Sequence, residues 1–379
     1  MVRPEAIFDA LRDQGAQFFT GVPDSLLKDL CSYIANRCDP STHIIAVNEG
    51  CAVGLATGHF LATGRPAVVY LQNSGLGNAI NPLLSLVDPA VYGIPMLLII
   101  GWRGEPGVAD EPQHCAQGPA TIPLLNALGI PSEILPEDES TAAQLAAELY
   151  KRAAKEGRPL ALVVRAKTFT KEPPVRKRPC QYPLSREAVL AVCVSSLPRA
   201  AVTISTTGKL SQELFAMRAK AGDHGQDFLS VGAMGHASQI ALGIALAQPT
   251  RPVYCFDGDG AALMHLGAWA AIGQFAPRTY RHIIFNNGAH ESVGGQPTLG
   301  FEVDFVAIAL GCGYRFARSV SQLTDLQAAL AELETVHGPA LLEIRVNLDI
   351  RPDLARPTRT PSETKWAFMQ RLGSLGASL

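Results

Sequence analysis

The sequence has little of what marks membrane proteins, nucleic-acid-binding proteins or zinc proteins. Its eight cysteines include no Cys-x-x-Cys pair, which argues against a zinc site and against a disulfide framework. No apolar run approaches the roughly 20 residues that span a bilayer, and the first six residues lead into an amphipathic helix and not into a signal peptide. Charged residues make up only 17% of the chain and the formal net charge is −2, so no charge patch is expected for nucleic acid or an anionic membrane. We therefore expect a globular, cytoplasmic protein that binds neither nucleic acid nor membranes.

Short runs of β-branched and apolar residues alternate with helical patterns along both halves of the chain. Such alternation is typical of parallel sheets with helices on both faces, and 379 residues are enough for two domains. We therefore predict an α/β protein with domains at residues 1–170 and 185–348. Residues 171–184 are rich in proline and basic residues and should form a linker. The tail, residues 349–379, should contain a short helix that starts at a capping box, Thr360 to Glu363.

The most informative stretch is Asp257-Gly258-Asp259-Gly260, which follows a predicted strand at residues 253–256. Its glycines should let the backbone turn tightly and approach a phosphate group, and the next helix start should direct N–H groups at that anion. Asp259 would repel the anion unless a cation lay between them. A second predicted strand, residues 282–285, ends in Asn286-Asn287 and offers amide oxygens at the neighbouring strand end. A carboxylate, an amide oxygen, a backbone carbonyl and phosphate oxygens are ligands that suit Mg²⁺.

Polar residues also follow the predicted strands of the first half. Asp24 and Ser25 lie in a turn after a strand, where they either cap the next helix or face a substrate. Glu49 stands at a helix start, where the helix dipole favours a carboxylate, so capping alone could explain it. Arg103 and His114 lie in a long polar loop, and such loops more often carry function than framework.

Several stretches of the chain match one family of enzymes. They are residues 21–25, 47–50, 72–78, 101–107, 258–265 and 286–298. With 25 residues between Gly-Asp-Gly and Asn-Asn, the sequence resembles the phosphonopyruvate decarboxylases of the thiamine-diphosphate-dependent decarboxylase superfamily. The likeness runs from about residue 5 to about residue 358, and sulfopyruvate decarboxylases are the nearest relatives of this family. Larger members of the superfamily carry a middle domain, for which residues 165–185 leave no room.

The resemblance implies a pyrimidine-binding first domain, a diphosphate-binding second domain and the cofactors thiamine diphosphate and Mg²⁺. It implies that Asp259, Asn287 and the backbone carbonyl of Ala289 hold the metal. Glu49 would face the cofactor's pyrimidine ring from a partner subunit, so the active protein would be a homodimer or a larger assembly with shared active sites. The remaining cofactor contacts implied by the resemblance are Ser205, Thr206, Gly208, Met234, Gly235, Gly258 and Gly260, with Met234 between the two cofactor rings.

The implied reaction is the decarboxylation of 3-phosphonopyruvate to phosphonoacetaldehyde and CO₂, a step of phosphonate biosynthesis. A carboxyl group at Glu49 that burial keeps protonated would donate a proton to the cofactor's pyrimidine ring. The substrate is a small anionic 2-oxo acid, so its pocket needs cations or convergent donors. Besides Glu49, the candidate catalytic residues are Asp24, His114 and His290, and the candidate substrate contacts are Ser25, Arg103 and Glu291.

Three other interpretations compete with this one. The enzyme could decarboxylate sulfopyruvate, or the chain could be a catalytically silent homologue that serves as a structural partner. The intact Gly-Asp-Gly and Asn-Asn motifs and Glu49 argue against a silent protein. The third, a Mg²⁺-nucleotide binder, is disfavoured because neither half contains a P-loop.

At the level of single residues, Arg103 could instead form an ion pair within its loop, with Glu105 or Glu111.

Overall fold

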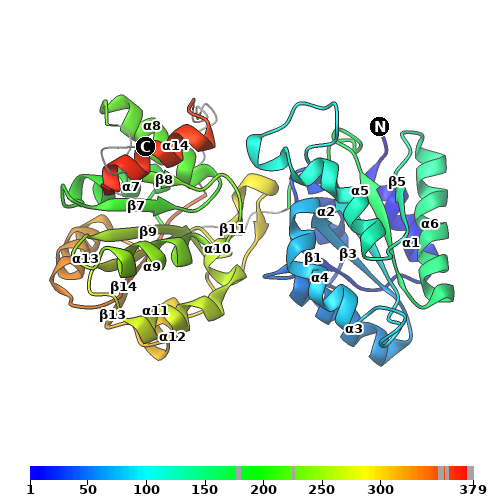
Figure 1. Ribbon diagram of the computed structural model, residues 1–379. Helices are drawn as coiled ribbons and strands as arrows, with labels where there is room; N and C mark the ends of the chain where they lie inside the picture. The colour runs from blue at the N-terminus through cyan, green and yellow to red at the C-terminus, as the bar shows by residue number, and fades with distance from the viewer. Residues whose placement is uncertain (176–180, 224–226, 349–353, 355–357, 374–379) are drawn as a thin grey trace. The chain divides into compact units, whose positions relative to one another are not determined.

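The computed structural model describes all residues except 176–180, 224–226, 349–353, 355–357 and 374–379. The chain divides into two compact units, each built around a six-stranded sheet (Figure 1). The first unit contains residues 1–177 and 290–297, and the second contains residues 178–289 and 298–379. Among the described residues, no helix is long and apolar enough to cross a membrane.

The sheet of the first unit is parallel, in the order β2-β1-β3-β4-β6-β5. Its strands β3, β4 and β6 are almost wholly buried and consist mainly of apolar residues, because both faces of the sheet are covered. The strands are β1 Phe19–Gly21, β2 His43–Ile45, β3 Ala67–Gln72, β4 Met96–Gly101, β5 Ser132–Ile134 and β6 Pro159–Val164.

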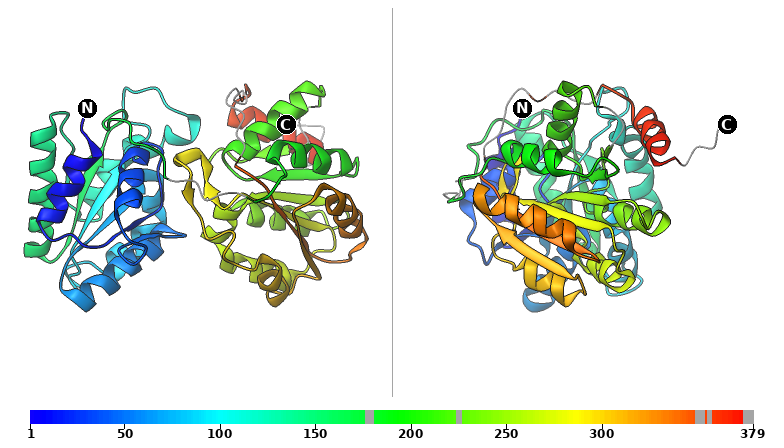
Figure 2. Two further views of the ribbon diagram at one scale, coloured as in Figure 1. Left: turned by 180° about the vertical axis from the view of Figure 1, so that it is seen from behind. Right: turned by 90° about the vertical axis from the view of Figure 1, so that its left-hand side faces the viewer.

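Helices pack on both faces of this sheet. Apolar side chains from α1, α2 and α6 form the core on one face, and those from α3, α4 and α5 form the core on the other. Figure 2 shows α1, in dark blue, in front of the sheet when the molecule is seen from behind. The helices are α1 Pro4–Asp13, α2 Lys28–Arg37, α3 Glu49–Thr63, α4 Leu76–Ser85, α5 Gln117–Ala127 and α6 Glu139–Glu156, with 3-10 turns η1 Asn73–Gly75 and η2 Pro112–His114.

The second unit repeats this plan with the strand order β13-β14-β10-β9-β7-β8, and these neighbouring strands pair in parallel. The predicted fold, two parallel sheets with helices on both faces, is therefore confirmed. The strands of this sheet are β7 Val202–Ser205, β8 Asp227–Leu229, β9 Val253–Gly258, β10 Tyr280–Asn286, β13 Phe316–Val320 and β14 Ala340–Arg345. A separate two-stranded pair joins β11 Ala289–His290 to β12 Gln296–Pro297.

On one face of the second sheet, side chains from α7, α8 and α13 join Tyr254 and Phe256 of β9 in a common core. Helices α9, α11 and α12 contact strands of the sheet or one another and include the buried Trp269 and Phe305. The capping box predicted at Thr360 and Glu363 is present and opens α14; the rest of the predicted tail lies largely outside the described residues. The helices are α7 Arg186–Ser196, α8 Lys209–Lys220, α9 Ala237–Ala247, α10 Asp259–Met264, α11 Trp269–Phe275, α12 Phe305–Gly311, α13 Leu323–Thr335 and α14 Pro361–Leu372, with η3 Leu266–Ala268 and η4 Glu291–Val293.

The turn at the Gly-Asp-Gly motif differs from the prediction. Strand β9 runs through Asp257 to Gly258, and α10 starts directly at Asp259. The strand continues because Gly258 still pairs with Phe285 of β10. The φ angle of Gly258 is −105°, which other residues can also adopt, so the backbone turn does not require glycine there. The space beside Gly258 is open to a distance of 4 Å, so its lack of a side chain leaves room for a ligand.

Both sheets reverse their winding direction at a defined place. In the first sheet β1 lies between β2 and β3, and in the second sheet β7 lies between β8 and β9. Ligands of open α/β sheets bind outside the carboxyl ends of the strands at such switch points. The structure therefore directs attention to the residues that follow β1 and β3 in the first unit and β7, β9 and β10 in the second.

Candidate active site

Three neighbouring strands of the second unit end in candidate site residues. Ser205 ends β7, Gly258 ends β9 and Asn286 ends β10. Because β9 pairs with both β7 and β10, these ends lie side by side at one edge of the sheet. Asp259 follows at once as the first residue of α10.

Asp259 is a carboxylate with neutral hydrogen-bond partners. It is 2% exposed and accepts hydrogen bonds from the Thr298 hydroxyl and, at 3.4 Å, from the backbone N–H of Asn287. Burial raises its pKa to about 6, against the smaller lowering effect of these donors. Among the described residues, no ion pair is recorded for Asp259. A negative charge at this position therefore lacks a cationic partner among the described residues of the second unit.

The two asparagines after β10 do different things. Asn286 is fully buried and donates from Nδ2 to the carbonyl of Gly300 and to Glu343, both at 2.6 Å, so it belongs to the framework. Asn287 turns its Oδ1 to the backbone N–H of Ala289 at 3.1 Å. Amide oxygens have two lone pairs, so Asn287 can keep this bond and still bind a metal.

The donor set at this edge fits a hard cation such as Mg²⁺. It combines the Asp259 carboxylate with the Asn287 amide oxygen, and such oxygens are the ligands that Mg²⁺ prefers. Gly300 lies against the same group, since a Cβ there would come within 2.5 Å of the Asp259 carboxylate and 2.6 Å of the Asn286 amide oxygen. Room for the carboxylate thus depends on glycine at position 300. A bound cation would also compensate the burial that raises the pKa of Asp259.

The end of β7 carries polar groups at the same edge. Ser205 is buried and accepts a hydrogen bond from Ser211 at 3.0 Å, while Ser211 also bonds the carbonyl of Thr206. The Thr206 hydroxyl is buried without a partner, which is costly unless a ligand completes it. Gly208 has a φ of 108°, a conformation that favours glycine, and precedes α8.

Met234 and Gly235 lie in the turn that leads to α9. Met234 is half-buried, and Gly235 has a φ of 86°. A Cβ at Gly235 would come within 2.6 Å of the His265 ring, whose Nε2 is buried without a partner. His236 stacks obliquely on His265, with ring centroids 4.5 Å apart. The roles implied for Met234 and Gly235 toward a cofactor remain predictions.

In the first unit, Glu49 is the first residue of α3 and is 5% exposed. The helix is capped not by Glu49 but by Asn48, whose side chain accepts from the N–H of Gly50 at 2.7 Å. Asn78 of α4 donates to Glu49 at 2.8 Å, and burial raises the pKa of the Glu49 carboxyl. Gly75 makes room for it, because a Cβ there would come within 2.2 Å of Glu49 Oε1. The capping interpretation of Glu49 therefore does not explain why it is buried here.

Asp24 is a second buried carboxylate of the first unit, placed after β1. Its Oδ2 accepts from the N–H groups of Leu26 and Leu27 at 2.9 and 3.2 Å, so it does hold the turn that leads into α2. Its Oδ1 accepts from Gln72 Nε2 at 2.6 Å, across the ends of β1 and β3. Burial raises the pKa of Asp24 despite these donors. Both interpretations of Asp24, as a cap and as a site residue, are thus compatible with its position.

Arg103 forms the ion pair that competes with a substrate role, but with a different partner from those expected. Its guanidinium binds both oxygens of Asp110, and it donates to the Ser25 hydroxyl at 2.7 Å. Glu105 pairs with Arg165 instead, at 2.8 Å. Arg103 pairs with Asp110 and not with Glu105 because the Asp110 carboxylate is also held in place by the N–H groups of Gly104 and Glu111.

The remaining candidates are placed as follows. His114 ends η2 and is buried, its Nδ1 has no partner, and burial lowers its pKa. His290 ends β11 and Glu291 begins η4, and both are half-buried. The structure therefore gathers Asp24, Ser25 and Arg103 into one cluster, and it gathers Asp259 and Asn287 into another.

Sequence reasoning missed several side chains that complete these clusters. Gln72 and Asn78 lie in a stretch that matched the family, residues 72–78, so a signal existed for both. Thr298 also lies in a stretch that matched the family, at the end of residues 286–298. Asp110 and Gly300 reach the site through the folding of loops, and no local pattern in the sequence marks these two.

Two family models match the chain. "Thiamine pyrophosphate enzyme, N-terminal TPP binding domain" covers residues 2–124, and "Thiamine pyrophosphate enzyme, C-terminal TPP binding domain" covers residues 207–344. A phosphonopyruvate decarboxylase from Streptomyces viridochromogenes is 38% identical over 97% of this chain and 94% of its own. Another from Streptomyces hygroscopicus is 36% identical over 98% and 94%. A sulfopyruvate decarboxylase from Methanosarcina acetivorans is 27% identical over 91% of each chain.

The two sheets, the residues at their switch points and these matches together define the class of protein. The chain belongs to the family of thiamine pyrophosphate enzymes. Within this family it is a decarboxylase, that is, a carboxy-lyase. The resemblance to phosphonopyruvate decarboxylases that the motifs indicated is confirmed.

Replacement of Gly75 by alanine should displace Glu49, because the new Cβ would collide with its carboxylate. Since a displacement of about 1 Å can cost on the order of 100-fold in rate, we expect a loss of that order in decarboxylase turnover with a folded protein by circular dichroism. Gly77→Ala in α4 is the matched control, as that position is open, and it should stay within about twofold of the native rate. Equal rates for the two variants would show that the position of Glu49 does not matter.

Proposed function

We propose that the protein decarboxylates 3-phosphonopyruvate to phosphonoacetaldehyde and CO₂, with thiamine diphosphate and Mg²⁺, as a step of phosphonate biosynthesis. The observation that carries this proposal is the likeness, at 38% identity over 97% of the chain, to a protein named phosphonopyruvate decarboxylase. The placement of buried carboxylates at the switch points of both units supports it. We also propose a cytoplasmic location, which is supported by the seven described cysteines, all of them free thiols.

Asp259 and Asn287, with the backbone carbonyl of Ala289, would hold Mg²⁺ against the diphosphate of the cofactor. The open space beside Gly258 and the unpartnered hydroxyl of Thr206 would accommodate the diphosphate end. Thiamine diphosphate, when bound, supplies the nucleophile and electron sink that decarboxylation of a 2-oxo acid needs. The chain supplies the cation site, the orientation and the proton-carrying groups.

Glu49 would hold a proton at its carboxyl group and donate it in a hydrogen bond to the pyrimidine ring. Burial raises the pKa of Glu49, which keeps the carboxyl in the donating form. Asn78 fixes one carboxyl oxygen at 2.8 Å, so the other oxygen is left to face the ring. Gly75 lets the carboxyl occupy this place without a steric clash.

The substrate phosphonate would bind near Arg103 and Ser25. In the structure Arg103 is neutralised by Asp110, so substrate binding would exchange one anionic partner for another. Arginine suits this role because its planar guanidinium binds phosphonate oxygens in pairs. Asp24, joined to Gln72 at 2.6 Å, would lie beside the reacting carbon, with His114, His290 and Glu291 as further proton-carrying or polar groups.

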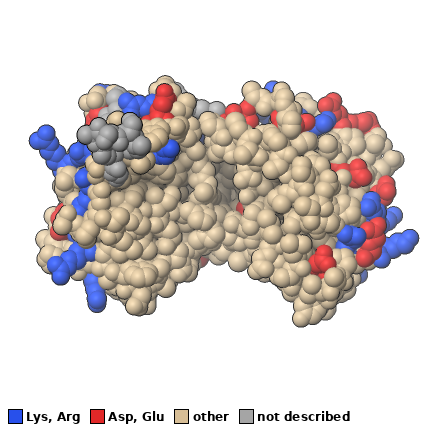
Figure 3. Space-filling view, in the orientation of Figure 1, with Lys and Arg blue, Asp and Glu red and all other residues tan. Residues whose placement is uncertain are grey.

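We further propose a homodimer or a larger assembly in which Glu49 of one chain serves the cofactor held by the second unit of its partner. Helices α4, α9, α11 and α12 contain no charged residue, and the one acidic residue of α3 is the buried Glu49. Figure 3 shows few charged side chains over these helices.

The same helices also offer small and apolar residues at the surface. Gly54 and Gly58 leave α3 open to close approach by another chain. Exposed large apolar residues on these helices are Leu61, Leu84, Leu246, Phe275 and Leu310. Depletion of charge is typical of interface cores.

A second candidate function is the decarboxylation of sulfopyruvate. It is favoured by the likeness, at 27% identity over 91% of both chains, to a protein named sulfopyruvate decarboxylase. The two substrates differ in charge, because a phosphonate carries up to two negative charges and a sulfonate one. Comparing kcat/KM for both acids under identical conditions decides between them. Equal or reversed preference would contradict our proposal.

Replacement of Glu49 by glutamine should abolish most turnover while the cofactor still binds. The amide keeps the shape and the bond to Asn78 but cannot supply a proton. Proton transfer by a positioned group contributes about 10²- to 10⁴-fold, so we expect a loss of kcat in that range. Cofactor affinity, measured by calorimetry, should change less than about tenfold, which corresponds to roughly one hydrogen bond. Unchanged turnover would refute the role given to Glu49.

Replacement of Arg103 by alanine should raise KM for 3-phosphonopyruvate. A charged hydrogen bond contributes about 1.5–3 kcal/mol, which corresponds to roughly 10- to 150-fold. The matched control is Arg152→Ala, which breaks the exposed ion pair with Glu156 on α6, away from this loop, and should leave KM within about twofold. If both variants had the native KM, Arg103 would not be a phosphonate ligand.

Replacement of Gly54 by arginine should separate the subunits. The side chain would project from an exposed position of α3 that is free of neighbours within 4 Å, and a charge buried in an interface is costly. We expect a monomer in sedimentation velocity and at least about tenfold lower activity per chain, because each site would lack its Glu49. Ala154→Arg on the exposed side of α6 is the control and should change neither property. An active monomeric variant would overturn the shared site.

A further inference from the structure

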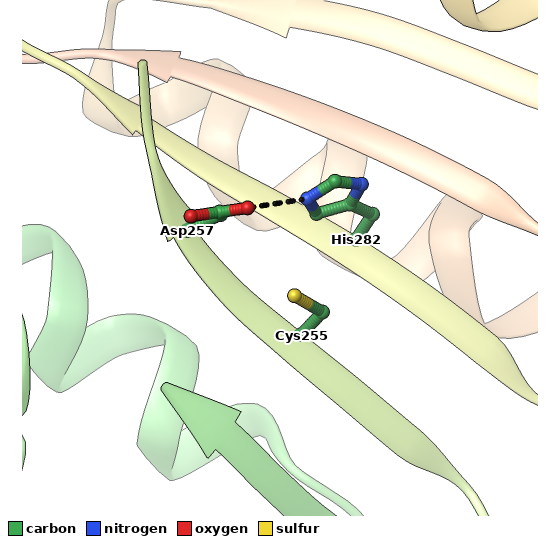
Figure 4. Close-up of side chains that lie close together, drawn as sticks. All are labelled: Cys255, Asp257 and His282. Carbon is green, nitrogen blue, oxygen red and sulfur yellow. Dashed lines mark hydrogen bonds and ion pairs between the residues drawn. The ribbon is translucent and has the colours of Figure 1, made fainter. Parts of the chain in front are cut away.

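A buried chain of hydrogen bonds runs through the second sheet directly beneath the Gly-Asp-Gly motif. Asp257 and His282, on the neighbouring strands β9 and β10, are 1% and 0% exposed in their side chains. Figure 4 shows the Asp257 carboxylate and the His282 ring pointing toward one another from these two strands, with Cys255 beside them. Asp257 Oδ2 lies 3.4 Å from His282 Nε2, and His282 Nδ1 lies 3.2 Å from the Tyr314 hydroxyl.

The direction of these bonds follows from the chemistry of the groups. A carboxylate only accepts hydrogen bonds, so a bond between the two groups assigns the donated proton to His282 Nε2, with Asp257 as the acceptor. His282 Nδ1 then accepts from the Tyr314 hydroxyl, whose pKa burial raises well above its usual value, so that it keeps its proton. The other oxygen of Asp257, Oδ1, accepts from the backbone N–H of Gly258 at 3.0 Å. The chain of bonds therefore ends at the motif itself.

The surroundings hold the imidazole in one orientation. The Trp269 ring meets the His282 ring edge-on, with centroids 5.2 Å apart, and Tyr280 approaches it at 6.1 Å. Tyr314 follows α12 and is 3% exposed. A residue so enclosed cannot change its rotamer without disturbing the packing. Because the core fixes the His282 ring, the ring in turn fixes the position of the Asp257 carboxylate that it bonds.

The cluster of Cys255, Asp257 and His282 has ligand atoms within 4.8 Å of one another, as a metal site would. Two observations favour hydrogen bonding instead. Asp257 and His282 already bond to each other, to Gly258 and to Tyr314. Burial also raises the pKa of the Cys255 thiol well above its usual value, whereas metals bind the thiolate.

We propose that His282 is a positioning residue for the cation and diphosphate site, acting through Asp257 and the Gly258 peptide on Asp259. The inference rests on the proposed use of Mg²⁺ and thiamine diphosphate. Asp259 directly follows Gly258, so the orientation of the Gly258 peptide determines the backbone position from which the Asp259 side chain projects. Residues that orient metal ligands through hydrogen bonds typically contribute 10- to 100-fold in metal affinity or activity. His282 itself touches neither cofactor nor substrate.

The test compares two variants of His282 that have different hydrogen-bonding ability. His282→Phe keeps the aromatic volume and removes the donor, whereas in His282→Gln the amide nitrogen can take the place of Nε2. Binding of thiamine diphosphate at saturating Mg²⁺, and of Mg²⁺ at saturating thiamine diphosphate, is measured by calorimetry. We expect both dissociation constants to rise about 10- to 100-fold in His282→Phe and to return to within about threefold of the native values in His282→Gln.

Two further variants control for effects on folding. Tyr314→Phe removes only the last bond of the chain and should weaken binding of both ligands in the same direction but less than His282→Phe. His43→Phe removes a comparable histidine–tyrosine bond, 2.8 Å from Nε2 to the Tyr70 hydroxyl, in the first unit. It should lower thermal stability without changing either dissociation constant.

Each outcome has a definite meaning. Native affinities in His282→Phe, equal losses in His282→Phe and His282→Gln, or equal losses in the His43 control would each overturn the inference. If His282→Phe did not fold, the direction of change in Tyr314→Phe would decide. A native protein that binds Mg²⁺ and thiamine diphosphate but does not decarboxylate 3-phosphonopyruvate would refute the proposed substrate and leave the inference about His282 standing. A native protein that bound no thiamine diphosphate would refute both.

Discussion

A buried negative charge at the end of β9 is the constraint on which the second unit depends. Asp259 is almost completely removed from water, and the groups that bond it are a hydroxyl and a backbone N–H. Such neutral donors compensate only part of the cost of burying a carboxylate. Three surrounding features suit a cation beside this carboxylate. They are the Asn287 amide oxygen, the missing side chain at Gly300 and the open space beside Gly258. A site of this kind is more stable with a cation present, which links folding of this edge to ligand binding.

The same physical arrangement occurs three times among the described residues. Each of three buried carboxylates, Asp24, Glu49 and Asp259, lies against a glycine at which a Cβ would come within 2.1 to 2.5 Å of it. Because no side chain fills that place, the carboxylate keeps a defined position instead of turning toward solvent. Burial then raises the pKa of each one. The glycines Gly101, Gly75 and Gly300 therefore act on the charge of the site and not only on the backbone.

The fold follows closely from the sequence, and the physical reason is periodicity. Runs such as residues 67–71 and 96–100 are apolar throughout because both faces of their sheets are covered, and this pattern is readable locally. The turn after β9 was less predictable, because Gly258 continues the ladder to Phe285 and its φ needs no glycine. The partner of Arg103 was also not predictable. Asp110 binds Arg103 because two backbone N–H groups already hold the Asp110 carboxylate in place. These two hydrogen bonds depend on the conformation of the loop, which the sequence does not predict.

The sequence alone determined the alternation of strands and helices, the motif that follows β9 and the family to which the chain belongs. These depend on neighbours along the chain or on fixed spacings, which the order of residues states directly. Only the tertiary structure decided which distant side chains meet: Gln72 with Asp24, Thr298 with Asp259, and Tyr314 with His282. Such contacts join residues 32 to 48 positions apart. The first two lie where parallel strands bring their carboxyl ends to one edge of a sheet, whereas Tyr314 reaches His282 inside β10 from the segment before β13. The packing of loops and helices against that edge then completes them.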